Sequence, residues 1–589
     1  MHRVRSALPA LASLLVCSSF WTTAHADWPA LGAPITRVTG DEQYPFTMAA
    51  DGMGGAYFSW SSTTDIAARL TGNGEHATGW GDGGLRFGGP TSMNIRCVAD
   101  GIGGCYFLFN AKDCVAHCGV DPSQRRVIRM GPSGTPSASW RVGALPVATL
   151  WGPVGVGASD AGQTDAIADG TGGLLVGWGQ HVGDRRGPVE LRVQRVGPTG
   201  IRVWGDSGVV VRPQSTVLPR VALAADGHGG SIAGWTDERS PGFFAQRISS
   251  TGSLEWQAAG VALADERVGF ASPPLATPDG AGGALFVWFG SVGGDSGIFA
   301  VRVNASGHLP WRRPLCVLRA SAGIDGLQLA ASRAGDVIVV WRDAREAGNE
   351  TIHAQRVGRG GRLEWPRGAV VCGARGHKAY VAATSDGADG AYIAWGDTRP
   401  EGEVFAMHLD RDGESTPGWR RDGNPICPPV AAVWQVSLAG DGNGGAVLAW
   451  ADERLPTTGR SFRVTQAMRL LPHGAATPIG DAARFERRNS PREPANETRA
   501  FGSLELRAAS PGPPATATLV QFVLPDASSA SLELYDLSGR RLWSRDVGPL
   551  GAGSHTVRLA DGAWLPPGVY FARLTRGLEA ATVRVTTLH

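Results

Sequence analysis

Four copies of the pattern W-x-D-x-R carry the residues of this sequence that are best suited to bind a polar ligand. Aspartate accepts hydrogen bonds and arginine donates up to five, so a ring of such pairs could receive a glycan or a peptide. The alternative is structural: each Asp pairs with its own Arg and braces the loop after a strand. The candidate ligand-binding residues are Asp237, Arg239, Asp343, Arg345, Asp397, Arg399, Asp452 and Arg454.

Motifs of well-known enzyme classes do not combine into a site in this sequence. G-D-S-G occurs at 205–208 and 294–297, as in the nucleophile turn of serine proteases, but no His and Asp stand in a recognisable partner frame. The motifs H-E-x-x-H and G-x-S-x-G are absent. A recurring D-G-x-G-G is followed by a strand-like run, whereas a phosphate loop leads into a helix. We therefore expect no catalytic residues, no metal and no cofactor.

The cysteines form two groups with different expected roles. After removal of an export signal seven remain, an odd number, so at least one is unpaired or bonds another chain. Three of them, Cys316, Cys372 and Cys427, follow a Trp at one repeated position and are expected to be small buried hydrophobes. The other four are candidates for one or two disulfides, whose pairing the sequence leaves open: Cys97, Cys105, Cys114 and Cys118.

Internal repeats determine the expected fold. The motif D-G-x-G-G, followed by apolar residues and an aromatic, occurs in eight intact or edited copies, and from Trp178 onward the aromatics are 53 to 57 residues apart. Between them lie an A-Q-R-V-like strand, a Gly-containing turn and a second Trp, as in AQRVGRGGRLEW (354–365). The eight aromatics are Trp60, Phe109, Trp178, Trp235, Trp288, Trp341, Trp395 and Trp450.

Each repeat contains four short strand-like stretches, and such units in tandem are typical of a β-propeller. Asp-Gly and Gly-Gly supply the positive φ angles that tight hairpins need. The first segment, WPALGAPI (28–35), matches WQAAGVAL (256–263), which is the fourth strand of a repeat. We therefore expect an all-β fold with an eight-bladed propeller over 27–479, its last blade closed by the N-terminal strand.

A second domain follows the repeats. The polar, aperiodic stretch 480–505 is expected to be a linker, and alternating strands over 506–589 suggest a small Ig-like β-sandwich. The stretches LELYDLSGRRLWS (532–544), GAGSHTVRLADG (551–562) and LPPGVYFARLTRG (565–577) resemble the type A C-terminal sorting domain of the bacterial type IX secretion system. They also resemble the Ig-like domain of flagellar hook-capping proteins. Departures from the family pattern are Ser510-Pro511-Gly512-Pro513 in place of Pro-Asn-Pro, and Arg584 in place of Lys.

The repeats themselves resemble those found upstream of such domains in secreted bacterial proteins. The resemblance implies export and surface display through the type IX machinery, and it implies no chemistry. An export signal agrees with it: Arg3 and Arg5 precede an apolar run at 7–20, and Ala24-His25-Ala26 is a cleavage pattern, so 1–26 is expected to be removed. No later stretch is apolar enough to span a membrane, and a net charge of +2 gives no basic field for nucleic acid.

Three functions are compatible with these features. The leading hypothesis is a secreted or surface-displayed, non-enzymatic propeller that binds extracellular polysaccharide or protein. The rival is an extracellular propeller enzyme, a glycosidase or lyase, with carboxylates from several blades over the central channel. A glycosidase needs two carboxyls roughly 5–10 Å apart, and the loop aspartates recur too regularly for that. The third is a structural repeat scaffold without a discrete ligand.

Overall fold

The structure, a computed structural model, has only strands as regular elements in the residues that it describes. Within this part of the chain, no helix is long and apolar enough to cross a membrane. The all-β class expected from the sequence is therefore confirmed. The described residues are 33–35, 45–61, 64–81, 83–87, 93–112, 123–136, 140, 145–150, 164–182, 188–215, 219–237, 242–264, 268–270, 272–332, 335–399, 403–427, 432–454, 462–473, 505–509, 519–524, 529–536, 540–547, 553–559, 568–576 and 579–587.

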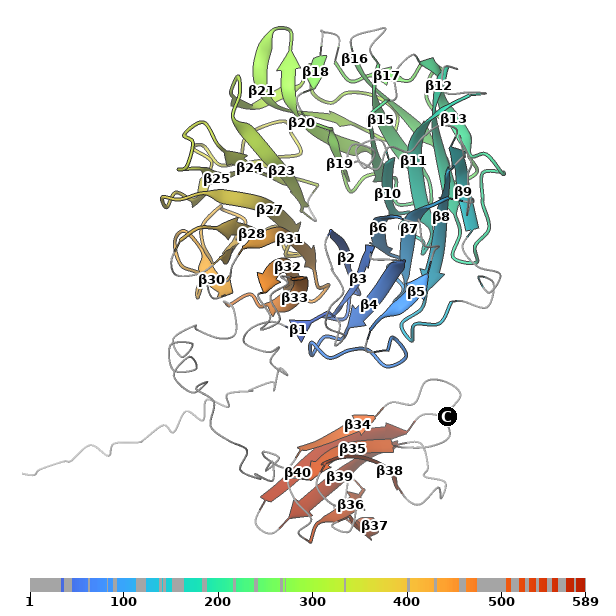
Figure 1. The fold of residues 1–589 in the computed structure, drawn as a ribbon, viewed down its shortest axis with the longest axis vertical. Helices are drawn as coiled ribbons and strands as arrows, with labels where there is room; N and C mark the ends of the chain where they lie inside the picture. The colour runs from blue at the N-terminus through green and yellow to red at the C-terminus, as the bar shows by residue number, and fades with distance from the viewer. Residues whose placement is uncertain are drawn as a thin grey trace, which may run out of the picture. The chain divides into compact units, whose positions relative to one another are not determined.

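The chain forms two compact units, unit 1 within Met1–Phe485 and unit 2 within Glu486–His589. The expected signal peptide, 1–26, and all of the expected linker except its last residue lie outside the described residues. In unit 1 the described residues form eight antiparallel sheets, one after another along the chain, and Figure 1 shows them fanned around a common centre. Each sheet contains the four stretches that repeat in the sequence.

Sheets 1 to 4 each have four strands in chain order. Their strands are β2 (Phe46–Ala50), β3 (Ala56–Ser61), β4 (Asp65–Leu70) and β5 (Leu85–Phe87); β6 (Met93–Ala99), β7 (Cys105–Lys112), β8 (Ser123–Met130) and β9 (Leu145–Leu150); β10 (Thr164–Ala168), β11 (Leu174–His181), β12 (Val189–Val196) and β13 (Val209–Ser215); β14 (Val221–Ala225), β15 (Ser231–Asp237), β16 (Gly242–Ile248) and β17 (Val261–Ala262).

Sheet 5 has five strands because two short strands, β18 and β19, both pair with β20. Sheet 8 takes its outer strand from the N-terminal segment. The strands of sheets 5 to 8 are β18 (Val268–Phe270), β19 (Leu275–Pro278), β20 (Ala284–Val292), β21 (Asp295–Val303) and β22 (Leu315–Arg319); β23 (Ile324–Ala331), β24 (Val337–Asp343), β25 (Thr351–Val357) and β26 (Ala369–Cys372); β27 (Lys378–Ser385), β28 (Ala391–Asp397), β29 (Val404–Leu409) and β30 (Asn424–Cys427); β31 (Val433–Gly440), β32 (Ala446–Arg454), β33 (Phe462–Leu470) and β1 (Ala33–Pro34).

The two ends of unit 1 meet in two places. β1 pairs antiparallel with β33, with Ala33 opposite Ala467, as the sequence predicts for the N-terminal segment. The inner strands of successive sheets contact each other in order, and β31 of the last sheet contacts β2 of the first. There the Gln435 side chain accepts the Phe46 N–H at 3.1 Å and donates to the Phe46 carbonyl at 2.7 Å.

The D-G-x-G-G motif is the turn between the first two long strands of a repeat, as expected. In sheet 5, Asp279 Oδ1 accepts the N–H groups of Ala281 and Gly283 at 2.8 and 2.7 Å. Gly280 and Gly282 have φ of 71° and 78°, which favours glycine. A Cβ on Gly283 would lie 2.3 Å from the Val303 carbonyl oxygen, so the last glycine is required for close packing of the third strand.

The second oxygen of this aspartate accepts an arginine from the third strand, the Arg of the A-Q-R-V element. In sheet 5, Arg302 Nε donates to Asp279 Oδ2 at 2.9 Å, and both side chains are buried. Sheet 6 keeps the pair but takes its acid from the end of an edited turn. The pairs are Asp51–Arg69, Asp100–Arg129, Asp169–Arg195, Asp226–Arg247, Asp279–Arg302, Asp336–Arg356 and Asp441–Arg469.

The same arginine also links one sheet to the next. Arg302 Nη1 and Trp311 Nε1 both donate to the carbonyl of Arg359, in the turn after the third strand of sheet 6, each at 3.2 Å. A Cβ on Gly361 of that turn would lie 2.8 Å from the Trp311 ring, so glycine lets the tryptophan lie flat on the turn. Six further Trp–carbonyl bonds repeat this link: Trp80–Pro132, Trp140–Pro198, Trp204–Ser250, Trp256–Ala305, Trp365–Arg411 and Trp419–Pro472.

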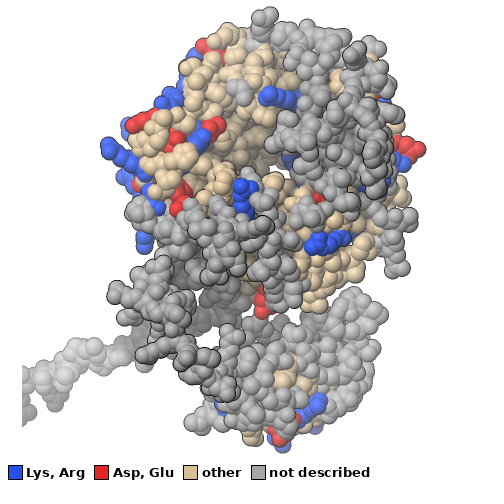
Figure 2. Space-filling view, in the orientation of Figure 1, with Lys and Arg blue, Asp and Glu red and all other residues tan. Residues whose placement is uncertain are grey.

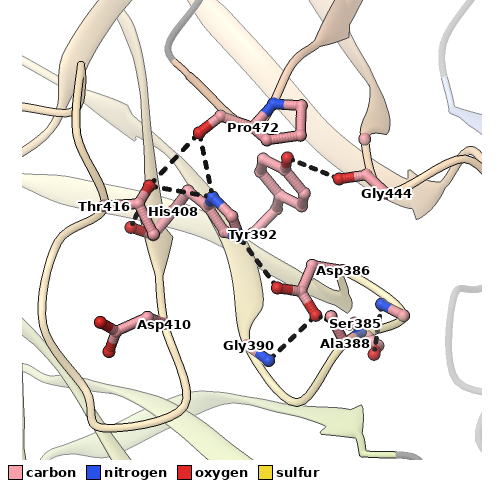
Figure 3. Close-up of polar contacts among 12 residues, drawn as sticks. Ser385, Asp386, Ala388, Gly390, Tyr392, His408, Asp410, Thr416, Gly444 and Pro472 are labelled. Atoms are coloured by element: carbon pink, nitrogen blue, oxygen red, sulfur yellow. Dashed lines mark hydrogen bonds and ion pairs between the residues drawn. The ribbon is translucent and has the colours of Figure 1, made fainter.

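Sheet 7 replaces the arginine by His408 (Figure 3). Its Nε2 lies 3.0 Å from Asp386 Oδ2, and its Nδ1 lies 3.0 Å from Thr416 Oγ1 and 3.4 Å from the Pro472 carbonyl of sheet 8. The ring stacks on Tyr392 with centroids 4.1 Å apart. The imidazole therefore joins the turn aspartate to the carbonyl of the next sheet, as the arginines do, with its two nitrogens in place of a guanidinium.

Unit 2 contains two sheets around one core. Val520 and Phe522 of the first sheet and Leu532 and Ala572 of the second are buried in a single cluster. The first sheet has strand order β34-β35-β38 and the second β37-β36-β39-β40. The strands are β34 (Glu505–Ala509), β35 (Leu519–Leu524), β36 (Ser531–Tyr535), β37 (Arg541–Asp546), β38 (Gly553–Arg558), β39 (Gly568–Arg576) and β40 (Glu579–Thr587).

Replacing Asp279 by Asn is expected to lower the free energy of unfolding of unit 1 by about 3–5 kcal/mol, because Arg302 stays buried without its counter-charge. Chemical denaturation followed by tryptophan fluorescence measures the loss. The control is Asp295→Asn, which removes an exposed pair with Arg319 and is expected to leave the midpoint unchanged. An equal loss in both variants would contradict a special role for the buried pair.

Acid is expected to weaken unit 1 through these turns. Burial acts to raise the pKa of Asp279, but the bonds from Arg302 and from the Ala281 and Gly283 N–H groups outweigh it and lower the pKa below 3.8. Asp169, Asp226 and Asp386 are shifted downward as well. Because the pKa of the carboxyl is lower in the folded state, its contribution to stability is complete above the ordinary pKa of 3.8 and is lost as the pH falls below that value. Unfolding midpoints measured across this range should fall on acidification, and less steeply in Asp279→Asn.

Candidate functional site

The W-x-D-x-R residues lie where the second long strand of a repeat ends. Asp343 and Asp397 are the last residues of β24 and β28, and Asp237 is the last residue of β15. In sheet 8 the strand β32 runs on to Arg454. The aspartates are therefore strand residues, whereas the sequence suggested a loop, and Arg345 and Arg399 follow the strand ends. The side chains of Asp237 and Arg454, and Arg239 altogether, lie outside the described residues.

In sheet 7 the motif is closed on itself. Arg399 Nε donates to Asp397 Oδ2 at 2.9 Å, and the same oxygen accepts Trp395 Nε1 at 2.9 Å. Arg399 also donates to the Asp422 carbonyl at 2.8 Å, and its guanidinium carbon lies 3.7 Å from the centroid of the Phe405 ring. The charged groups of Asp397 and Arg399 are thus engaged with other residues of the protein.

The other described copies differ in exposure. Asp343 pairs with Arg345 (Nε–Oδ1 2.9 Å), and this ion pair lowers the pKa of Asp343, but the Arg345 side chain is 55% exposed. In sheet 8, Asp452 is buried and accepts Trp450 Nε1 at 3.2 Å. The three aspartates of the motif whose side chains the structure describes therefore receive a neighbouring indole or guanidinium, and Arg345 is the most exposed of the described charges of the motif.

A second constellation, which the sequence analysis missed, joins sheets 6 and 7 on this side. Glu350, just before β25, is buried, and its Oε1 lies 3.0 Å from His377 Nδ1. Its Oε2 accepts the Lys378 N–H at 3.2 Å. Burial acts to raise the pKa of Glu350, but hydrogen bonds from its own backbone, His377 and Lys378 outweigh it and lower the pKa to about 2. Glu350 is thus a fixed anion behind an imidazole.

His377 is the exposed member of this pair. Its side chain is 54% exposed, and its Nε2 makes no hydrogen bond to any residue that the structure describes. Its backbone is fixed because its N–H donates to Thr398 Oγ1 at 3.0 Å and its carbonyl accepts the Thr398 N–H. A ring held at Nδ1 by a carboxylate, with Nε2 free, is the arrangement of a general base.

Cations and a strained residue surround this pair. Arg342 donates to the Lys378 carbonyl at 2.5 Å and makes two bonds to Asp325, and Lys378 is buried with its Nζ donating to backbone carbonyls, including that of Gly376 at 2.9 Å. Two residues beyond Lys378, Tyr380 has a φ of 54° in a bulge of β27 and is 44% exposed. Such φ values are uncommon outside glycine and mark positions worth testing for function.

Glu403, between β28 and β29, has the opposite titration behaviour from Glu350. Burial, and secondarily the Asp397 charge, raise its pKa. On the face drawn in Figure 2, acidic and basic side chains of unit 1 are interspersed, in keeping with the near-zero net charge.

The cysteines and metal ligands contribute less. Cys97 and Cys105, on paired strands, are buried with their Sγ atoms 2.8 Å apart, and no disulfide joins them. Cys114 and Cys118 lie outside the described residues. Of the three cysteines that follow a Trp in the repeats, Cys372 and Cys427 are buried and Cys316 is half-buried. Among the described residues, no three His, Cys, Asp or Glu side chains are grouped as metal ligands.

No protein-family model and no curated protein matches this sequence. Solved structures are similar in fold. Prolyl oligopeptidase B from Galerina marginata is 10% identical with a TM-score of 0.37, covering 83% of this chain and 57% of that one, so the chain spans little more than half of its length. A PL25 ulvan lyase is 10% identical (TM-score 0.33; 66% and 93% covered). An α-L-arabinofuranosidase from Fusarium graminearum is 13% identical (TM-score 0.27; 56% and 96% covered).

The prediction that this protein is not an enzyme is corrected by these findings. The ulvan lyase and the arabinofuranosidase are enzymes, and so is a GH43 protein from Xanthomonas citri of similar fold. The prediction rested on the absence of familiar motifs, and that absence does not exclude catalysis. At 9–13% identity, these likenesses name neither a substrate nor a catalytic residue for this chain.

The two described Asp–Arg pairs are expected to respond differently to truncation. Arg399→Ala should lower the free energy of unfolding by about 1–3 kcal/mol, because it leaves buried Asp397 short of a donor and strips the Phe405 ring. Arg345→Ala should change it by less than about 0.5 kcal/mol, because that side chain is largely exposed. Thermal and denaturant unfolding of both variants test this, and equal effects would contradict the assignment of a bracing role to Arg399.

Proposed function

We propose that the eight sheets of unit 1 are the blades of a closed eight-bladed β-propeller, and that the protein is an extracellular enzyme that cleaves an acidic polysaccharide. Support for closure comes from the β1–β33 pairing and from the Gln435–Phe46 bonds between the last and first inner strands. Unit 2 is proposed to be an Ig-like sorting or anchoring domain of the type IX system, and the leading segment an export signal, so that the protein acts outside the cell.

The observation that supports catalysis is the Glu350–His377 pair. The imidazole is oriented by a buried carboxylate and presents Nε2 to solvent. A base of this kind suits eliminative cleavage at a uronic acid. Nε2 takes the proton from C5, which is next to the sugar carboxyl; a C4–C5 double bond forms; and the C4–O4 bond breaks. The imidazolium can return the proton to the departing O4 oxygen, so atoms and charge balance without another acid.

Elimination is favoured over hydrolysis by the state of the carboxylates. A glycosidase of the usual kind needs two accessible carboxyls about 5–10 Å apart. The described aspartates of β23, β24 and β28 are engaged: Asp325 with Arg342, Asp343 with Arg345, and Asp397 with Arg399. Arg345, whose side chain is largely exposed, is proposed to attract the uronate carboxyl, whose charge must be offset when C5 loses its proton.

The test uses the full-length protein with polygalacturonate, alginate and glucuronan, scoring new reducing ends and the ultraviolet absorbance of unsaturated uronates in the same wells. His377→Ala is expected to reduce the rate by about 10²-fold or more. His308→Ala, which changes an exposed histidine in the turn after β21, is the matched control and should keep the activity.

Three results would contradict the proposal. One is the absence of product from every uronate polymer. Another is reducing ends without unsaturated sugars, which would indicate hydrolysis. The third is full activity of His377→Ala. Thermal unfolding of each variant separates loss of chemistry from loss of fold. Because His377→Ala leaves buried Glu350 short of a donor, a loss of about 1–3 kcal/mol in the free energy of unfolding is expected, with the fold retained.

A further inference from the structure

We propose that a pocket at the outer edge of sheet 5 binds an anionic saccharide, at a site separate from Glu350 and His377. The pocket has a volume of about 510 Å³ and lies along β22, the outermost strand of sheet 5. Residues Leu263 and Ala264, which follow β17 of sheet 4, form part of its wall. A pocket of this size is within the range of about 300–1,000 Å³ that holds a small ligand.

Sheet 5 differs from sheets 4, 6, 7 and 8 where the pocket is found. It lacks their W-x-D-x-R motif, as sheets 1 to 3 do, and its second and third strands run on as a ladder to Val292 opposite Asp295. The turn there is Gly293-Gly294, both with positive φ, so the G-D-S-G at 294–297 begins in a hairpin turn and continues as the first residues of β21, and it is no nucleophile elbow. Val292 and Asp295 of this hairpin both line the pocket.

The charge of the lining is strongly unbalanced. Arg312, Arg313 and Arg319 face one acid, Asp295, which is bonded to Arg319 at 2.8 Å. Arg312 and Arg313 are exposed and make no hydrogen bond or ion pair with any residue that the structure describes. Two guanidinium groups, with donors arranged as a fork, are therefore available to a carboxylate or a sulfate ester.

The remaining wall is apolar and includes Leu309, Pro314 and Leu315. A pyranose ring carrying a carboxylate or sulfate combines a C–H face with an anionic edge, which matches this division. An acyl chain would need an apolar wall throughout, and four charged side chains line this pocket. The chemistry therefore points to an acidic sugar unit, and carboxylate and sulfate are the two sources to distinguish.

Sheet 7 provides a matched control within the same protein. Trp311-Arg312-Arg313 follows the turn after the third strand of sheet 5, and Trp419-Arg420-Arg421 occupies the same position in sheet 7. Arg420 and Arg421 are also exposed, but neither lines the pocket. A double Ala substitution at either place removes the same charge from the same local structure.

The experiment is calorimetric titration of full-length protein carrying His377→Ala, so that the proposed cleavage, if it occurs, does not consume the probe. The probes are trigalacturonate, a sulfated carrageenan oligosaccharide and neutral maltotriose. Arg312→Ala/Arg313→Ala is expected to weaken binding of an anionic probe at least about tenfold, and Arg420→Ala/Arg421→Ala to leave it unchanged. Binding should also weaken with added salt.

The outcomes discriminate as follows. Loss of binding confined to the sheet 5 variant supports the pocket, and the anionic probe that binds identifies carboxylate or sulfate. Equal loss in both variants, binding of maltotriose at similar strength, or no binding of either anion would overturn it. Unchanged unfolding midpoints are expected for both variants, and failure of polysaccharide cleavage would not affect the result, because binding is measured in a cleavage-disabled background.

Discussion

The buried aspartate of the D-G-x-G-G turn, with its partner in the third strand, is the constraint on which unit 1 depends. One oxygen fixes the turn through two N–H groups, and the other fixes the cation that reaches the next sheet, as at Asp279 and Arg302. An ion pair removed from water gains little net energy, but losing one member is costly. The ion pair therefore serves mainly to position the strands: it fixes each hairpin relative to the neighbouring sheet.

Much of this could be predicted from sequence, because the repeated residues are those with backbone duties. Positive-φ glycines, strand periods and the Trp series recur in register, and they gave the strands, the turns and the N-terminal pairing with β33. The partners of polar side chains could not be derived in the same way. Nothing in A-Q-R-V says that its Arg meets the turn aspartate, because that contact depends on the stagger between strands one and three.

The candidate site was missed for the opposite reason. Glu350 and His377 lie in connecting segments that do not repeat, and they meet only because β25 and β27 belong to neighbouring sheets. The repeated W-x-D-x-R drew attention instead, and its described copies are mostly directed inward. Repetition marks what every sheet needs for packing, whereas chemistry needs one asymmetric point, so departures from the repeat were the better guide.

The pairing of β1 with β33 has a consequence for how the molecule is made. Ala33 and Ala467 are neighbours in the fold, yet the chain between them comprises seven complete sheets and most of an eighth. During synthesis the first strand has no partner until the last repeat exists, so its exposed edge must stay unpaired for most of the chain's emergence. Contacts of such large sequence separation slow folding and lengthen the time in which a wrong edge can be captured. The β1–β33 pair can thus form only after nearly all of unit 1 has been synthesised.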